Sequence, residues 1–149
     1  MRVVVQRTIH ADVRVNGQSV GHIDRGLLLL VGIGHEDTHE TIELIAKKIV
    51  SLRIFEDIDG KMNLSVRDVS GSLLSISQFT LYANCKKGNR PSFIDACEPQ
   101  KAKELYDYFN NHLREQYNLQ VATGIFGASM EVDFINQGPV TIILDSTQL

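Results

Sequence analysis

The sequence predicts a single α/β domain in which mixed, mainly antiparallel β-sheets, as two packed sheets or a partial barrel, carry two amphipathic helices as an outer layer. Two observations predict this class. Short β-prone runs separated by turn residues dominate both ends of the chain, and two well-separated stretches have apolar residues at helical spacing. The chain has 149 residues, 43% of them hydrophobic, with no linker, repeat or low-complexity segment. We therefore expect one domain over residues 1–149.

The first part of the chain reads as a series of strands. Residues 2–7 hold a run of β-branched valines, and residues 12–15 alternate apolar and charged side chains up to Asn16-Gly17, a dipeptide typical of tight hairpin turns. Residues 18–24 form the expected returning strand. Residues 26–34 are almost wholly apolar, which favours a central strand covered on both faces.

Two amphipathic helices are predicted. Asp37 followed by Glu40 resembles a capping box, and apolar residues then recur at helical spacing over about residues 38–52. Pro99 stands at the first position of a second helix, which runs to about Glu115. Each apolar stripe requires a sheet to pack against.

Shorter strands complete the predicted sheets. They are residues 53–56 and 62–64 on either side of an Asp59-Gly60 turn, then 119–123, 130–134, and 139–144 after an Asn136-Gln137-Gly138 turn. Together the strands exceed what one helix-covered sheet needs, which favours a second sheet or a partial barrel.

The stretch from Gly71 to Ala83 carries the most specific chemical signal in the chain. Apolar, β-prone residues from Leu73 through Phe79 to Leu81 predict a core strand, and Ser77, Gln78 and Thr80 interrupt this apolar run. Polar groups in such a place must find partners, because an unsatisfied buried polar group costs about 1–3 kcal/mol. These side chains therefore bond either the fold or a ligand.

Composition excludes several classes of protein. The net charge of −3 argues against a protein that coats nucleic acid, although Lys86, Lys87 and Arg90 form one concentrated basic patch for RNA phosphates. The apolar run at the N-terminus is too short for a signal peptide, and no run reaches the roughly 18 apolar residues of a membrane span. We expect a cytoplasmic protein with no membrane partner.

No metal or cofactor site is expected. Cys85 and Cys97 have no Cys-His spacing typical of zinc, and Asp95 and Glu98 show no paired-carboxylate pattern. The histidines lie away from residues 71–83 in the sequence, at positions 10, 22, 35, 39 and 112. The sequence therefore predicts neither a metal centre nor an organic cofactor.

Several motifs, spread over the whole chain, carry a family likeness. The two most specific are Ser-Gln-x-Thr at residues 77–80 and Gly-Pro-x-Thr at residues 138–141, in this order and at this separation. The others are residues 1–7, 52–56, 61–64 and 87–93. Together they resemble the D-aminoacyl-tRNA deacylases, also called D-tyrosyl-tRNA deacylases.

The resemblance implies a homodimer that acts on the aminoacylated 3′ end of tRNA. Such an enzyme hydrolyses the ester joining a D-amino acid to the terminal adenosine, a chiral proofreading step in translation, and also acts on glycine mischarged on tRNA(Ala). The resemblance assigns the catalytic pocket to Ser77, Gln78, Phe79 and Thr80.

The resemblance also implies a gate against L-amino acids. Gly138-Pro139, joined by a cis peptide bond, would reach into the pocket of the partner subunit, and Arg7 would help to hold that loop. Asn136 and Met130 are grouped with this gate, Met130 as core or pocket wall. Backbone carbonyls cannot retract as side chains can, so they would exclude an L side chain without recognising the D side chain.

The residues favour a mechanism without a protein nucleophile, because Thr80 has no expected base to accept its proton. In the alternative that needs no acid-base side chain, the vicinal 2′-hydroxyl of the RNA would position or activate water, and backbone N–H groups would stabilise the oxyanion. The resemblance assigns that stabilisation to the amides of Phe79 and Thr80 and the binding of the adenosine to Ser77 and Gln78. Two alternatives stay open: a Thr-nucleophile esterase of small esters, and a non-catalytic module that binds tRNA 3′ ends.

Overall fold

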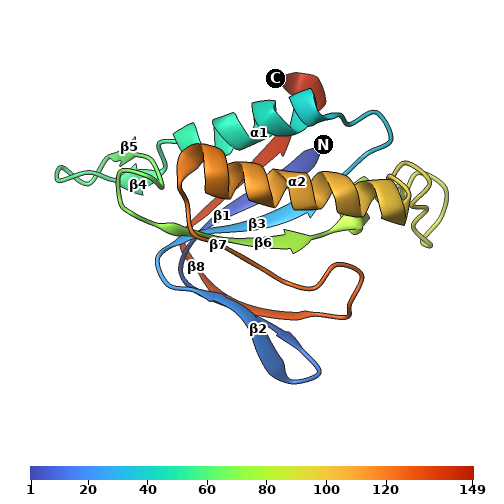
Figure 1. Cartoon of the computed structure of the whole chain (residues 1–149), viewed down its shortest axis with the longest axis horizontal. Coiled ribbons are helices and arrows are strands. Elements are labelled where there is room, and N and C mark those ends of the chain that lie inside the picture. Colours follow the sequence, from blue (N-terminus) through green and yellow to red (C-terminus); the bar gives the residue numbers. More distant parts are fainter.

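Strand β1 (Arg2–Val15) pairs along both of its edges in the computed structural model, which describes residues 1–149 (Figure 1). One edge pairs with β8 (Glu131–Asp145) over almost its whole length. The other edge pairs with β3 (Gly26–Gly32) through its first half and with β2 (Gln18–Ile23) through its second half. All three pairings are antiparallel, which agrees with a chain rich in hairpin signals.

The sheet continues beyond β3 with two parallel strands. β6 (Ser72–Ser77) pairs with β3, and β7 (Val121–Thr123) pairs with β6. β7 in turn approaches β2, where a Cβ atom added to Gly21 would lie 2.6 Å from the carbonyl oxygen of Thr123. The mixed sheet is therefore nearly closed into a barrel, which confirms the predicted fold class.

Helices α1 (His39–Ser51) and α2 (Pro99–Tyr117) lie together over one face of this sheet (Figure 1). Their apolar stripes, which include the fully buried Ile45 and Phe109, pack on side chains of β1, β3 and β6. Leu28 of β3 belongs instead to a second, smaller apolar cluster inside the barrel. β3 is thus covered on both faces, as its continuous apolar run predicts.

The N-terminus of α1 differs from the predicted Asp37–Glu40 capping box. Thr38 is the N-cap, and it exchanges side-chain and backbone hydrogen bonds with Thr41. Asp37 instead accepts a hydrogen bond from the buried N-terminal ammonium group of Met1. A buried ammonium group needs a paired carboxylate. This contact across the fold therefore takes Asp37 away from the capping role that its position in the sequence suggests.

The small elements lie close to their predicted positions. β4 (Phe55–Glu56) and β5 (Met62–Leu64) form a separate two-stranded sheet. α2 begins at the predicted Pro99 and ends beside Asn118, whose φ of 52° is the left-handed conformation that commonly follows a helix. A short 3-10 helix, η2 (Ser146–Gln148), ends the chain. No helix of the structure has both the length and the hydropathy needed to cross a membrane.

Two continuous strands replace shorter predicted ones. β1 is a single strand where the sequence predicts a break between residues 7 and 12, and β8 runs through the predicted turn at residues 136–138. The reason is that the two strands pair with each other on both sides of an irregular region near residue 8 of β1. The chain keeps its direction through the predicted break in β1 and through the predicted turn in β8.

The predicted turn is a bulge within β8. Gln6 pairs with Thr141 and Thr8 pairs with Asn136, so β1 contributes only Arg7 between these pairs whereas β8 contributes residues 137–140. Extra residues on one strand of an antiparallel pair must leave the ladder. We name residues 137–140 the β8 bulge.

Replacing Phe109 with alanine tests the helix layer. Phe109 is fully buried between α2 and the sheet, so we expect Phe109→Ala to lower the free energy of unfolding by about 3–5 kcal/mol. The matched control is Ile58→Ala, at a fully exposed site, which should change it by less than about 0.5 kcal/mol. Urea denaturation followed by circular dichroism gives both values. Equal losses in the two variants would contradict this packing.

Candidate active site

A cavity of about 590 Å³ opens where the parallel strands β3 and β6 end. The start of α2 and residues 126–132, which lead into β8, form its other walls. Most of its lining is apolar, and the polar groups of Ser77 and Gln78 stand at one side. A mainly apolar cavity of this size with a few polar groups is typical of a small-molecule site. We call it the pocket.

The segment after β6 turns into a 3-10 helix, η1 (Phe79–Tyr82), where the sequence predicts a continuing strand. The N–H of Gln78 donates to the carbonyl oxygen of Val31 at 2.7 Å, the last such bond between this segment and β3. β3 ends one residue later, at Gly32. The strand prediction from Phe79 onward is therefore wrong, because no strand edge remains to pair with.

η1 leaves two backbone amides free at the rim of the pocket. The N–H groups of Phe79 and Thr80 open the helix, so no carbonyl of η1 can accept from them. They donate to no other backbone or side-chain atom of the chain. Two adjacent free donors beside an apolar cavity can stabilise an oxyanion.

Thr80 has no base. Its hydroxyl oxygen accepts a hydrogen bond from the Gln78 carboxamide nitrogen, and no histidine or carboxylate bonds it. A carboxamide N–H cannot accept a proton. Thr80 is exposed and lies outside the pocket lining, whereas Ser77, Gln78 and Phe79 belong to it. The geometry disfavours a threonine nucleophile.

Arg2 fixes η1 against the start of β1. Its guanidinium group donates to the carbonyl oxygen of Leu81 at 3.1 Å and lies 4.7 Å from the centre of the Tyr82 ring. Tyr82 packs so closely on Gly34 that an added Cβ atom there would lie 2.7 Å from the tyrosine hydroxyl. Burial raises the pKa of Tyr82, so its hydroxyl stays protonated at neutral pH.

The pocket wall offers no acid-base pair. Tyr106 donates its hydroxyl hydrogen to the carbonyl oxygen of Ser75 at 2.8 Å, and burial raises the pKa of Tyr106. Burial also raises the pKa of the Cys97 thiol, which keeps it from being a thiolate nucleophile. Glu98 is the single carboxylate of the lining, and no histidine lines it. Chemistry here must use backbone groups or groups of the ligand.

Sequence reasoning missed Tyr106 and Cys97 as pocket residues. Tyr106 was indistinguishable from the other apolar positions of its helix, and Cys97 precedes α2 by two residues. Met130, by contrast, lies in the pocket wall with Phe126. The signal that could have found the missed pair is the position of the α2 N-terminus at the ends of parallel strands, where ligands commonly bind.

The β8 bulge is held by two side chains. Arg7, only 5% exposed, donates from Nε to the carbonyl oxygen of Gln137 at 3.2 Å and from Nη1 to that of Ile54 at 2.7 Å. On the other side, Asn136 Oδ1 accepts from the N–H of Val140 at 3.2 Å. Gly138 and Pro139, joined by a cis peptide bond, form the exposed tip. The bulge therefore presents backbone groups on a braced support.

The bulge lies far from the pocket of its own chain. Arg7 pairs with Leu27 in β3, whereas Gln78 binds the carbonyl of Val31. The four residue steps of β3 from Leu27 to Val31 span about 13 Å along the strand. In the perpendicular direction, each neighbouring strand between the bulge and the pocket adds about 4.8 Å. Neither Arg7 nor any residue of 136–140 lines the pocket. The structure brings Ser77, Gln78, Phe79 and Met130 together and leaves the other predicted gate residues, Arg7, Asn136, Gly138 and Pro139, apart from them.

The basic patch lies on a loop beside the pocket. A β-bridge between Asn84 and Ser92 closes the loop that carries Lys86, Lys87 and Arg90, all exposed and free of ion pairs. Next to this bridge, the Phe93 ring contacts Phe79 edge-on, with ring centroids 5.1 Å apart, and both residues line the pocket. The positive charge thus lies near the pocket entrance.

Solved structures share this fold. The chain aligns with the c-Myc DNA unwinding element binding protein at a TM-score of 0.92 and 42% identity, over 97% of this chain and 98% of that one. It also aligns with a probable eukaryotic D-amino acid tRNA deacylase at a TM-score of 0.82 and 18% identity, over 96% and 97% of the two chains. The second likeness shows the fold alone.

Sequence comparison defines the family. The D-Tyr-tRNA(Tyr) deacylase family matches residues 4–145. The chain is 59% identical to the D-aminoacyl-tRNA deacylase of Brevibacillus brevis over 98% of this chain and 100% of the relative. It is 52% identical to that of Thermosipho melanesiensis over 100% and 99% of the two chains. The chain is a hydrolase and belongs to the D-Tyr-tRNA(Tyr) deacylase family, which confirms the resemblance.

Replacing Arg7 with lysine tests the support of the β8 bulge. A lysine ammonium group keeps the charge but cannot reproduce the fixed fork that reaches the carbonyls of Gln137 and Ile54. We expect Arg7→Lys to lower the free energy of unfolding by about 2 kcal/mol and to speed hydrogen exchange at the Val140 amide.

The matched control for this experiment is Arg53→Lys. Arg53 also donates to a backbone carbonyl but is exposed, so its replacement should change stability by less than about 0.5 kcal/mol. Chemical denaturation and exchange measured by NMR report both effects. Unchanged exchange at Val140 in Arg7→Lys would show that Arg7 does not brace the bulge.

Proposed function

We propose that this chain hydrolyses the ester joining a D-amino acid to the terminal adenosine of tRNA, releasing the free D-amino acid and tRNA. The observation that carries the proposal is the pair of free amides of Phe79 and Thr80 beside a pocket without an acid-base pair. Family membership and the names of the relatives support the substrate class. The proposed reaction removes D-amino acids before they enter protein synthesis, so we infer that the protein works with translation in the cytoplasm.

The proposed mechanism is substrate-assisted catalysis. The 2′-hydroxyl of the terminal ribose lies next to the ester and positions or activates the attacking water. As the tetrahedral intermediate forms, its oxyanion receives hydrogen bonds from the N–H groups of Phe79 and Thr80. Ser77 and Gln78 bind the terminal adenosine, and the Phe79–Phe93 pair offers an aromatic surface on which the base stacks.

We propose that a second copy of the chain discriminates D-amino acids from L-amino acids. The β8 bulge is too far from its own pocket, yet its exposed tip is rigidly braced by Arg7 and Asn136. In a homodimer, the tip with Gly138 and Pro139 would enter the partner subunit's pocket and leave no room for an L side chain. Glycine has no side chain to exclude, so the same gate would admit glycine mischarged on tRNA(Ala).

The basic loop is proposed to hold the acceptor end of the tRNA. Lys86, Lys87 and Arg90 have no competing ion pairs and lie near the pocket entrance, where the phosphates of the acceptor end would pass. Such contacts carry affinity and orientation rather than base specificity. They therefore suit an enzyme that recognises the amino acid and the terminal adenosine.

Thr80→Val separates the RNA-assisted mechanism from a threonine nucleophile. We expect the variant to keep measurable deacylation of D-tyrosyl-tRNA, because the Thr80 amide remains and its hydroxyl has no base. The wild-type enzyme should act about 10²–10⁴-fold more slowly on a substrate whose terminal adenosine lacks the 2′-hydroxyl. Single-turnover deacylation measures both rates.

The same assay tests the two alternatives. A threonine-nucleophile esterase would lose all activity in Thr80→Val, would still act on the deoxy substrate and would cleave a simple D-tyrosine ester. A binding module would turn over none of the three substrates. Either result would overturn the RNA-assisted mechanism.

Mixed dimers test where the β8 bulge acts. Gly138 has a φ of 123°, and an added Cβ atom would lie 2.8 Å from the Val140 side chain, so Gly138→Ala should displace the bulge and weaken D-selective deacylation. Gln78→Ala should inactivate the pocket. If the bulge reaches across the dimer, an equimolar random mixture recovers about a quarter of the wild-type sites, because half of its dimers each contain one intact site.

The control is the same mixture kept under conditions that prevent subunit exchange. Exchange is followed by native mass spectrometry, using an isotope label on one variant. If the bulge serves its own chain, the Gly138→Ala chain of each mixed dimer has a defective gate over a live pocket and the Gln78→Ala chain has a dead pocket, so no site is intact. No recovery after proven exchange would therefore rule out a gate between subunits.

A further inference from the structure

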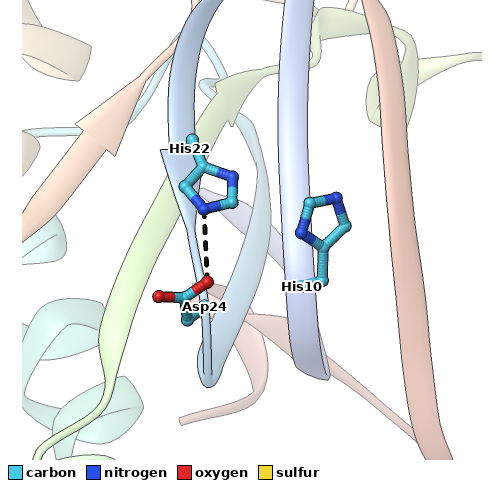
Figure 2. Close-up of side chains that lie close together, drawn as sticks. All are labelled: His10, His22 and Asp24. Atoms are coloured by element: carbon cyan, nitrogen blue, oxygen red, sulfur yellow. Dashed lines mark hydrogen bonds and ion pairs between the residues drawn. The ribbon is translucent and has the colours of Figure 1, made fainter.

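The hairpin of β1 and β2 carries a cluster of metal-ligating side chains away from the pocket. Figure 2 shows His10 on β1 beside His22 on β2 and Asp24, which follows β2. One potential ligand atom from each of the three lies within 4.8 Å of the other two. None of these residues lines the pocket, and the proposed deacylation uses none of them.

Two of the three groups already have the separation that a metal requires. His22 Nε2 lies 3.2 Å from Asp24 Oδ1 (Figure 2). Zinc bonds of about 2.0–2.1 Å in a tetrahedral arrangement place neighbouring ligand atoms about 3.3 Å apart. The His10 ring stands on the adjacent strand, with its centroid 5.1 Å from that of His22. Bringing the His10 nitrogen from at most 4.8 Å to about 3.3 Å from the other two ligand atoms would complete a three-ligand face.

A buried carboxylate lies on the other side of the His22 ring. Asp12 pairs with His22 across the hairpin and is only 6% exposed. Its Oδ2 accepts from the Ser19 hydroxyl and lies 4.0 Å from His22 Nδ1, while Oδ1 lies 3.0 Å from Arg14 Nε. At 4.0 Å this contact is longer than a hydrogen bond, but it places a carboxylate on the Nδ1 side of the ring. A carboxylate is the partner that the second nitrogen of a metal-binding histidine commonly takes, which leaves Nε2 to bind the metal.

The backbone of His10 is also fixed. The buried Thr8 hydroxyl accepts from the N–H of His10 at 3.1 Å and donates to its carbonyl at 2.6 Å. This pair of bonds occurs where the pairing of β1 with β8 is irregular, between Thr8 and Ala11. The third ligand therefore projects from a defined support rather than from a mobile loop.

We propose that His10, His22 and Asp24 bind a divalent transition-metal ion of the zinc class, with Asp12 orienting His22 and solvent filling the remaining position. Two imidazole nitrogens and one carboxylate oxygen suit Zn²⁺, Co²⁺ or Ni²⁺ better than Mg²⁺ or Ca²⁺, which prefer oxygen ligands alone. The ion joins β1 to β2 and stabilises the hairpin, which projects from the body of the protein (Figure 1).

The proposed site departs from the sequence prediction, which found no ligand set at metal-binding spacing. The spacing of His10, His22 and Asp24 matches no compact motif, because the Asn16-Gly17 turn and the pairing register bring the ligands together. Counting residue pairs outward from that turn would pair His10 with Ile23 and miss the cluster, because the register shifts by one residue between Val13 and Arg14.

Zinc titration by calorimetry tests the proposal with ZnCl₂ and the full chain. We expect one Zn²⁺ ion per chain in the wild type and at least a tenfold loss of affinity in His10→Gln, His22→Gln and Asp24→Asn. His112→Gln and Cys85→Ser are matched controls, an imidazole and an exposed thiol outside the cluster, and should bind as the wild type does. Zinc at 100 times its Kd should raise the wild-type Tm by about 5–10 °C.

Wild-type NMR gives a second readout that does not depend on any variant folding. Zinc should shift the imidazole nitrogen signals of His10 and His22 and leave those of His35, His39 and His112 unchanged. The proposal is overturned if no zinc binds, if binding survives in His22→Gln, if it disappears in Cys85→Ser, or if the other histidines shift instead.

Discussion

The pairing of β1 along both edges is the constraint on which the rest of the structure depends. Because β8 occupies one edge and β3 and β2 share the other, each functional element lies at a fixed offset along one strand. Arg2 at its start anchors η1, Arg7 supports the β8 bulge, and His10 lies between the stretches of β1 that pair with β3 and with β2. A register shift in β1 would therefore misplace all three.

The candidate active site relies on backbone groups, and this follows from what surrounds it. Burial raises the pKa values of Tyr82, Tyr106 and Cys97, so the pocket and its support contain neutral groups at physiological pH. The free amides of η1 add hydrogen-bond donors beside the pocket, and the proposed gate would add the backbone of the β8 bulge from a partner subunit. Since conformation rather than side-chain chemistry places these groups, the glycines and arginines around them matter as much as the pocket residues.

The fold was predictable where local pattern and tertiary packing agree. The continuous apolar run of β3, the Asn16-Gly17 hairpin and the helix beginning at Pro99 all appear as the sequence predicts. The sequence predictions are wrong where a contact between residues distant in the sequence overrides the local pattern. The ammonium group of Met1 takes Asp37 from its expected cap, and the end of β3 bends the chain at Phe79 although the run remains apolar.

The sequence alone determined the fold class, the order of the elements and the polar segment from Ser77 to Thr80, because periodicity and turn chemistry act over a few residues. Only the tertiary structure decided that the pocket and the β8 bulge lie apart, and that the hairpin register brings His10 to His22. These outcomes depend on strand register. Register is fixed by pairing between segments distant in sequence and by the burial of one face, which no local pattern encodes.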